Sequence, residues 1–401
     1  MINSKRLLAA GIAASLVLAA CGGDDDTTTT DAPATGDTTA DTSADMSSDM
    51  SSDMSSDMSS DMSSDMSSDM SSEMTGDTAA SDITVGLTFD LLGRGDQSFN
   101  DSAAAGMDQA VADLGVTVNE VTPTDASARG TDLQLQAENA DLVIGVGFSF
   151  ATDAATVAAE NPDVKFAIVD DSMLNFDNDP PTPIAENAAG LVFAEQEGSY
   201  LVGVAAALKS ETGKIGFIGG VSGIGLIEKF EAGYTAGAMS VNPDIDVTVA
   251  YITEFPDFDG FASPDRAAEI ASAMYAEGAD IVYAAAGLSG SGVFAAAKET
   301  SENSGSKVWG IGVDSDQYLT VDPAVQEYVL TSMIKRVDVA VYAVTESVVN
   351  GTFTPGEVRY DLSVDGVGYA TSGGFIDDIV PQLEEAKAAI IAGDIEVPTA
   401  P

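Results

Sequence analysis

From residue 83 onward, short runs of β-branched and apolar residues alternate with longer Ala-rich segments. Short apolar runs are typical of buried strands, and the Ala-rich segments between them predict helices. The predicted strands are residues 83–89, 141–146, 164–169, 214–218, 247–252, 281–284, 308–313 and 328–333. The predicted helices are residues 99–114, 196–208, 226–239, 264–277 and 292–299.

This repeated strand-then-helix order predicts an α/β fold with two doubly wound parallel sheets. We expect one lobe from residues 82–195 with 334–362, and a second from residues 196–333 with 363–397. The late segments cross back between the lobes and form the hinge. Ligands of such folds bind at the carboxyl ends of the strands, so the cleft between the lobes is the expected site.

The first 20 residues have the pattern of a secretory signal, with Lys5 and Arg6 before the apolar stretch 7–18. The residues Leu18-Ala19-Ala20-Cys21 resemble a bacterial lipobox, in which the cysteine is diacylated and becomes the new N-terminus. A simple signal peptide with an accidental cysteine is the alternative. Because two acyl chains anchor a protein stably, we expect attachment to the extracytoplasmic face of the bacterial cell membrane.

Residues 21–81 contain little that could form a core, and residues 45–72 are seven Asp-Met-Ser-Ser repeats. A four-residue period drifts around a helix of 3.6 residues per turn, so the methionines do not form a stripe. The segment is predicted to be a disordered acidic tether, with weak cation binding as the alternative. A flexible coil of this length would span roughly 40 to 45 Å.

Composition excludes several classes of function. The 65 acidic residues against 15 basic ones give a formal net charge of -50, which disfavours nucleic acid as a partner and indicates a heavily hydrated surface. The chain has no histidine and one cysteine, so internal disulfides, Cys/His zinc sites and His-dependent nucleophilic catalysis are excluded. We therefore expect no catalytic residue, no cofactor and no metal.

Seven short runs follow one another along the body of the chain. They are residues 95–100 (GDQSFN), 161–170 (NPDVKFAIVD), 197–203 (EGSYLVG), 213–220 (GKIGFIGG), 278–282 (GADIV), 310–317 (GIGVDSDQ) and 331–335 (TSMIK). Together they resemble the basic membrane protein (BMP) family of lipoproteins, which includes purine nucleoside receptors. The resemblance implies a type I periplasmic-binding-protein fold and nucleoside uptake through an ABC transporter.

Three residues near the first predicted strand are candidates for holding the base. Asp90 follows that strand and is similar to the family residue that hydrogen-bonds the base, although it could instead cap the next loop or helix. Phe99 resembles one of two rings that stack on the base, with an ordinary core position as the alternative. Ser98 stands where we expect asparagine in some purine-binding relatives, and a hydroxyl cannot present an amide, so the base and ribose preferences stay open.

The second stacking ring is expected from the aromatic loop 255–261. Aligning the predicted helix 264–277 with the family pattern favours Phe261, with Phe258 as the alternative. Gly287 follows a predicted strand and allows the backbone to approach a ligand closely. The glycines at 287–292 lack the Lys-Ser/Thr pair of a phosphate-binding loop, so we interpret them as a turn.

Charged residues at three strand ends resemble the ribose-binding part of the family's site. Asp170 is similar to a ribose ligand, with Asp171, or a helix-capping role, as alternatives. Asp314 and Lys335 resemble a ribose clamp, and charge-assisted hydrogen bonds to hydroxyls would give it strength. A structural ion pair at the hinge is the alternative.

These observations predict a monomeric solute-binding protein of an ABC importer that closes on a nucleoside, purine by resemblance. Its expected partners are the permease and ATPase subunits and, through Cys21, the membrane. One alternative is a sensor or surface receptor for another small solute. Another is a nucleoside hydrolase that uses paired carboxylates as acid and base.

Overall fold

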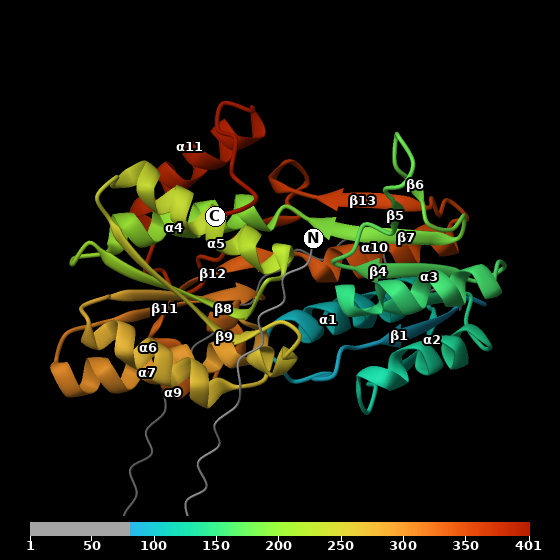
Figure 1. The fold of residues 1–401 in the computed structure, drawn as a ribbon, viewed down its shortest axis with the longest axis horizontal. Coiled ribbons are helices and arrows are strands. Elements are labelled where there is room, and N and C mark those ends of the chain that lie inside the picture. Colours follow the sequence, from blue (N-terminus) through green and yellow to red (C-terminus); the bar gives the residue numbers. More distant parts are fainter. Residues whose placement is uncertain (1–80) are drawn as a thin grey trace, which may run out of the picture. The chain divides into compact units, whose positions relative to one another are not determined.

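A computed structural model of the protein describes residues 81–401 (Figure 1). The expected signal peptide (1–20), Cys21 and all but the last residue of the expected tether (21–81) lie outside the described residues. Two six-stranded sheets with helices on both faces make up the described chain (Figure 1).

The first sheet has the strand order β13-β7-β4-β3-β1-β2, and all of its neighbouring strands are parallel. Its strands are β1 (Thr84–Thr88), β2 (Thr117–Val121), β3 (Leu142–Gly145), β4 (Lys165–Val169), β7 (Ala188–Phe193) and β13 (Gly356–Tyr360). Helices α1 (Phe99–Leu114) and α10 (Val337–Val349) pack together on one face, and α2 (Arg129–Ala137) and α3 (Ala151–Glu160) on the other. The inner strands β1, β3, β4 and β7 are covered on both faces, which explains why they are buried at nearly every position, whereas the edge strands β2 and β13 are largely exposed.

The second sheet has the order β14-β12-β11-β10-β8-β9, and only β14 runs antiparallel. Its strands are β8 (Lys214–Ser222), β9 (Asp246–Glu254), β10 (Ile281–Ala285), β11 (Trp309–Asp314), β12 (Val329–Lys335) and β14 (Val367–Tyr369). The longer helices are α4 (Glu195–Lys209), α5 (Gly225–Val241), α6 (Pro264–Ala276), α7 (Gly290–Ser304) and α11 (Val380–Ile391). Two short helices, α8 (Gln317–Thr320) and α9 (Pro323–Gln326), follow β11. A small hairpin of β5 (Leu174–Asn175) and β6 (Thr182–Pro183) lies earlier in the chain, between β4 and β7 of the first sheet.

Helices α4 and α5 pack very closely because glycines remove side chains from their contact. A Cβ atom on Gly203 would collide with the carbonyl oxygen of Tyr234, and one on Gly237 with that of Tyr200. The helices α6 and α7 cover the opposite face of this sheet.

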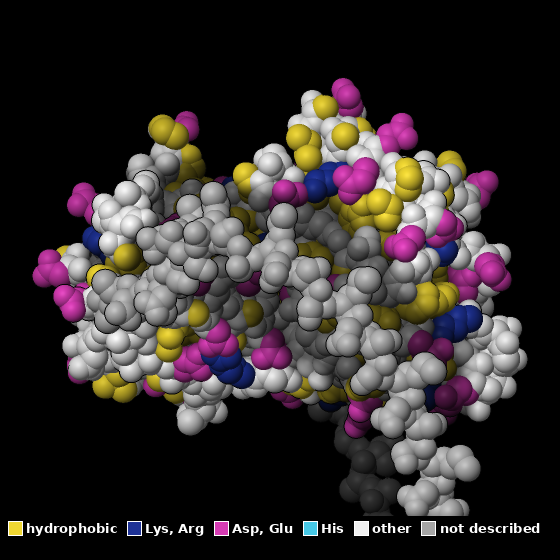
Figure 2. All heavy atoms as spheres, turned by 180° about the vertical axis from the view of Figure 1, so that it is seen from behind, with side chains coloured by type: hydrophobic (Ala, Val, Ile, Leu, Met, Phe, Trp, Pro, Cys, Tyr) yellow, Lys and Arg dark blue, Asp and Glu magenta, His cyan; other side chains and the backbone are white. Residues whose placement is uncertain are grey.

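The predicted fold class is confirmed, with two doubly wound parallel sheets. The chain passes between them after β7, after β12 and after β13, and α10 packs on α1 although the strand before it belongs to the second sheet. These crossings agree with the expected lobe division, whose boundaries stay a prediction. Figure 2 shows acidic side chains spread over the visible surface with few basic side chains among them.

Candidate ligand-binding site

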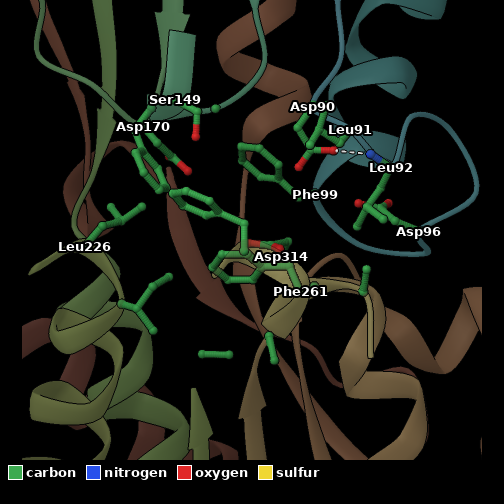
Figure 3. A pocket seen from close by; sticks show the side chains of 18 of the residues that line it. Asp90, Leu91, Leu92, Asp96, Phe99, Ser149, Asp170, Leu226, Phe261 and Asp314 are labelled. Atoms are coloured by element: carbon green, nitrogen blue, oxygen red, sulfur yellow. Dashed lines mark hydrogen bonds between the residues drawn. The ribbon is translucent and has the colours of Figure 1, made fainter. Parts of the chain in front are cut away.

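A cavity of about 170 Å³, partly open to solvent, lies between the carboxyl ends of the two sheets. Both sheets contribute to its walls. The predicted site residues that line it are Asp90, Phe99, Asp170, Phe261, Gly287, Asp314 and Lys335. Figure 3 shows Phe99, Asp170, Phe261 and Asp314 around one space, with Asp90 and Asp170 drawn on opposite sides of Phe99.

The strand order of the first sheet sets the spacing of its polar residues. Asp90 follows β1 and Asp170 follows β4, and β3 lies between these two strands. Because adjacent strands are about 4.8 Å apart, the two strand ends are separated by roughly 10 Å. In the second sheet, Lys335 and Asp314 end the neighbouring strands β12 and β11, and Gly287 follows β10. The site is therefore elongated, with charged groups concentrated towards one end.

Asp90 presents one free carboxylate oxygen to the cavity. Its Oδ1 accepts hydrogen bonds from the backbone N–H of Leu92 at 2.9 Å and from Nδ2 of Asn100 at 2.7 Å, while Oδ2 has no partner within residues 81–401. Burial raises the pKa of Asp90, and these two hydrogen bonds oppose the shift. Asp90 thus stabilises its own loop, as the capping alternative requires, and still offers an acceptor to a ligand.

Phe99 is the first residue of α1 and is partly buried against the core. Gly147, which comes shortly after β3, lies beside this ring, since a Cβ at that position would be in ordinary contact with Phe99 Cε1 at 3.7 Å. The ammonium of Lys335 is 4.8 Å from the centroid of the same ring. The ring therefore both lines the cavity and contacts its buried cation.

Ser98 does not line the cavity, in contrast to its predicted role as a ligand residue. It is fully buried, and its hydroxyl lies 2.7 Å from Oδ2 of Asp314 and 3.1 Å from the carbonyl oxygen of Val313. The turn before α1 places this hydroxyl in contact with the end of β11. Ser315 returns a hydrogen bond to the Ser98 carbonyl at 2.9 Å. Ser98 therefore joins the two sheets.

Lys335 forms its ion pair with Asp170. Asp314 and Lys335 were predicted as a ribose clamp, with a structural ion pair as the alternative, and both line the cavity. Lys335 Nζ donates to Oδ2 of Asp170 at 2.7 Å, whereas Asp314 accepts from the Ser98 hydroxyl. Only 2% of the Lys335 side chain and 5% of the Asp170 side chain are exposed. Lys335 ends β12 in the second sheet and Asp170 follows β4 in the first, so this ion pair connects the two sheets across the cavity. Oε1 of the fully buried Glu195 lies 3.9 Å from the same ammonium.

Asp170 keeps one acceptor unused. Its Oδ1 is buried and has no hydrogen-bond partner in the described part of the chain. The neighbouring Asp171, the alternative candidate, instead caps its own turn by accepting from the N–H of Met173 at 2.8 Å, and it is not part of the cavity wall.

Two strand-end aspartates adopt the left-handed backbone region that non-glycine residues rarely occupy. The φ angle is 70° at Asp170 and 64° at Asp314. Such conformations cost free energy and concentrate at functional sites. Here they turn one carboxylate from each sheet into the cavity.

Burial raises the pKa of Asp314 to about 6, although Lys335 and the Ser98 hydroxyl act in the opposite direction. Burial also disfavours the ammonium of Lys335, but the carboxylates of Asp170, Asp314 and Glu195 outweigh it and raise its pKa. The cation is therefore retained at neutral pH.

Both candidate rings of the second sheet line the cavity, in the segment η3 (Phe258–Phe261). Phe261 packs on Gly220, where a Cβ would collide with its ring. The Phe258 ring lies 6.2 Å from the ring of Phe148, which comes shortly after strand β3 of the first sheet. Phe261 thus lies against its own sheet, whereas Phe258 contacts the opposite wall. The choice between them as the stacking ring stays a prediction.

The further lining residues, which were not predicted, include Arg129, Phe148 and Phe230. Phe148 comes shortly after the strand β3, so the strand-end argument that selected Asp90 and Asp170 applied to it equally. Arg129 is buried, but this burial exists only in the folded chain, so the sequence offered no signal that separates it from an exposed arginine. Phe230 lies inside α5 and carried no signal.

Within residues 81–401, no group of three or more His, Cys, Asp or Glu side chains is placed to hold a metal ion. The cavity instead combines aromatic faces, unused carboxylate oxygens and one paired ammonium. These groups suit a ligand that has a flat ring and several hydroxyl donors.

Two parallel α/β sheets with three crossings and a cavity at their carboxyl edges define a solute-binding protein of the type I periplasmic-binding fold. A crystal structure of an ABC-transporter solute-binding protein from Aeropyrum pernix K1 has this fold, with a TM-score of 0.67 and 29% sequence identity. The similarity covers 79% of this chain and 93% of that one.

The chain belongs to the Bmp family, described as ABC transporter substrate-binding protein PnrA-like, whose family model matches residues 83–400. It is 36% identical to a CD4+ T-cell-stimulating antigen of Listeria innocua, over 81% of this chain and 90% of that protein. It is 34% identical to the ABC transporter nucleoside-binding protein BmpA of Lactococcus lactis, over 80% of this chain and 90% of that protein.

The predicted family is therefore confirmed. The protein is an extracytoplasmic substrate-binding protein of an ABC transporter, with a small solute and the permease and ATPase subunits as partners. None of the helices between residues 81 and 401 is both long and apolar enough to cross a membrane.

Proposed function

We propose that the protein captures a nucleoside in this cavity and delivers it to an ABC permease, while diacylated Cys21 holds it at the membrane. The base lies between Phe99 and Phe261, with Asp90 on its edge. The ribose hydroxyls bind at the opposite end, near Asp170, Asp314 and Lys335.

The observation that carries this proposal is the unused Oδ1 of Asp170. A buried acceptor without a hydrogen bond costs about 1 to 3 kcal/mol, and a ribose hydroxyl is a donor that can satisfy it. Lys335 already holds Oδ2, so the carboxylate is fixed before the ligand arrives. The roughly 10 Å between the ends of β1 and β4 matches the length of a base joined to a ribose.

Binding favours a closed arrangement of the two lobes. Contacts across the cavity include the Lys335–Asp170 ion pair, the Ser98–Asp314 hydrogen bond and the Phe148–Phe258 ring contact. A ligand that touches both walls adds contacts only in the closed state and shifts the population towards it. The permease then recognises the closed shape.

Isothermal titration calorimetry on the full chain tests the proposal with purine and pyrimidine nucleosides, free bases, ribose and hexoses. We expect one nucleoside per chain, much weaker binding of ribose or base alone, and recovery of the unmodified ligand. Chemically altered nucleoside would support the hydrolase alternative. Tight binding of a hexose without nucleoside binding would refute the proposal.

Two matched pairs of variants locate the site. Phe99→Ala is expected to lower affinity about 10- to 100-fold, because stacking on a base contributes about 1 to 3 kcal/mol; Phe176→Ala, on an exposed loop, is its control. Asp170→Asn is expected to weaken binding strongly, whereas Asp171→Asn should bind nearly as the parent does. Equal effects within either pair would contradict the assignment.

A further inference from the structure

Arg129 is a buried guanidinium on the cavity wall that no other side chain of residues 81–401 pairs with. It is the first residue of α2, only 9% of it is exposed, and it lines the cavity. Within the described residues it makes no ion pair and no side-chain hydrogen bond, and its buried Nε has no partner. By contrast, Arg94 is bound by Asp108 and Glu120.

Packing fixes the Arg129 side chain without using its donors. Its Cζ lies 5.7 Å from the ring centroid of the fully buried Phe150, so the planar group is supported on one face. A buried charge without partners is unfavourable, and proteins keep such a group where a ligand completes it.

Arg129 belongs to the Asp90 end of the cavity. Helix α2 packs on β1, where a Cβ on Gly86 would lie 2.8 Å from the side chain of Gln136. Arg129 is two helical turns before Gln136, on the side of the helix nearer the carboxyl end of β1 and therefore nearer Asp90. The positive charge of Arg129 also acts on Asp90, where it opposes the rise in pKa that burial causes.

The base end of the cavity therefore carries one free acceptor, Oδ2 of Asp90, and a set of free donors on Arg129. Asp90, Asp96, Asp170 and Asp314 all line the same cavity, so the surroundings oppose an anionic ligand. The donors of Arg129 thus suit neutral acceptor atoms.

A 6-oxopurine base carries the hydrogen-bonding groups that complement the acceptor of Asp90 and the donors of Arg129. It has an N1–H donor beside the acceptors O6 and N7, whereas adenine has an acceptor at N1 and an amino donor at position 6. Arginine has donors only, and its bidentate contact with O6 and N7 of guanine is a frequent and selective one. Pyrimidines lack the N7 acceptor.

We propose that Arg129 is the residue that makes this cavity prefer 6-oxopurine nucleosides, inosine and guanosine, over adenosine and pyrimidine nucleosides. This inference rests on the proposed nucleoside binding and specifies its base. Asp90 accepts the N1–H, and Arg129 donates to O6 and N7.

Calorimetry with inosine, guanosine, 7-deazaguanosine, adenosine and uridine tests the inference on the parent protein and two matched variants. Arg129→Met removes the guanidinium but keeps a long side chain on Phe150, and Arg266→Met removes an exposed arginine of α6. The parent is expected to bind inosine and guanosine at least about tenfold more tightly than adenosine. Arg129→Met should weaken both about 10- to 100-fold, equivalent to about 1.4 to 2.8 kcal/mol, and change adenosine less than about threefold.

The deaza analogue separates base recognition from a packing role. It should bind the parent about tenfold more weakly than guanosine does, and this difference should vanish in Arg129→Met. Melting temperature supplies a second readout: removal of an unpaired buried charge should leave it unchanged or raise it, whereas a structural role would lower it.

The outcomes separate the two proposals. If the parent binds no nucleoside, both are overturned. If it binds nucleosides but Arg129→Met weakens all of them equally, or the deaza penalty persists in the variant, only the role of Arg129 is overturned. Arg266→Met should match the parent throughout.

Discussion

The ammonium of Lys335 lies among three buried carboxylates, and its removal should destabilise the fold strongly. It is 2.7 Å from Asp170 and 3.9 Å from Glu195, and its charge also acts on Asp314. In Lys335→Met the stem still packs against aromatic rings, but Asp170 loses its partner. Breaking a buried ion pair in this way costs about 3 to 5 kcal/mol, because the remaining charge stays in the interior. Glu195 retains Lys229 at 3.0 Å, so Asp170 accounts for most of the loss.

Urea unfolding at pH 7.5 measures this loss, and two further variants test its cause. Lys335→Met combined with Asp170→Asn removes both charges, and we expect it to recover at least half of the lost stability. Lys387→Met breaks the exposed pair with Asp365 and should cost no more than about 1 kcal/mol.

The pH dependence gives an independent check. Without the cation, the pKa of Asp314 rises further above its present value of about 6 and thus further above that of the unfolded chain. A carboxyl group whose pKa is raised by folding contributes stability at low pH and loses it as the pH rises through the folded-state pKa. The deficit of Lys335→Met should therefore be larger at pH 8 than at pH 5. A deficit below about 1 kcal/mol at pH 7.5, or one independent of pH, would refute this account.

Three other predictions concern separate parts of the molecule. Asp314→Asn removes a carboxyl whose pKa is raised by burial, so urea unfolding between pH 4 and pH 7 should show a smaller loss of stability with rising pH than the parent shows. Cys21→Ser should move the protein from the membrane fraction to the soluble fraction, and mass spectrometry of the parent should show one diacylglyceryl group, which carries two acyl chains, on the cysteine sulfur. Gly203→Ala inserts a methyl group against the carbonyl of Tyr234, where α4 and α5 pack closely. Urea unfolding should show a loss of about 1 to 3 kcal/mol, the usual cost of overpacking a core.

Local signals were sufficient for the central elements of the fold. The predicted helix 99–114 has the observed bounds of α1, and Gly115 ends it in the left-handed conformation, with φ of 66°. The edge strand β2 was missed because its residues are mostly exposed and only weakly apolar. The strand β7 was missed because Ala-Ala-Gly opens it, and these residues have low strand propensity.

The site was predictable where it depends on one strand and unpredictable where it depends on two sheets. The strand-end rule placed Asp90, Asp170 and Asp314 on the cavity wall. It did not identify the partner of Lys335, because that requires the relative placement of β12 and β4. Arg129 follows no strand directly, so only its burial in the folded chain separates it from an exposed arginine.

The charge balance of the site explains why a neutral polyol suits it better than an anion. Each sheet turns one strand-end aspartate into the cavity through a left-handed residue, and Glu195 adds a third buried carboxylate. Around Lys335, the ammonium groups of Lys335 and Lys229 face these three carboxyl groups, and burial raises the pKa of Asp314 to about 6. Elsewhere on the cavity wall, Asp90 and Asp96 stand against the guanidinium of Arg129, so carboxyl groups outnumber cations there as well. A phosphate would add negative charge to this excess, whereas hydroxyl groups donate hydrogen bonds to it without changing the charge. The same excess of acceptors that makes Lys335 necessary for stability therefore selects a ligand rich in donors.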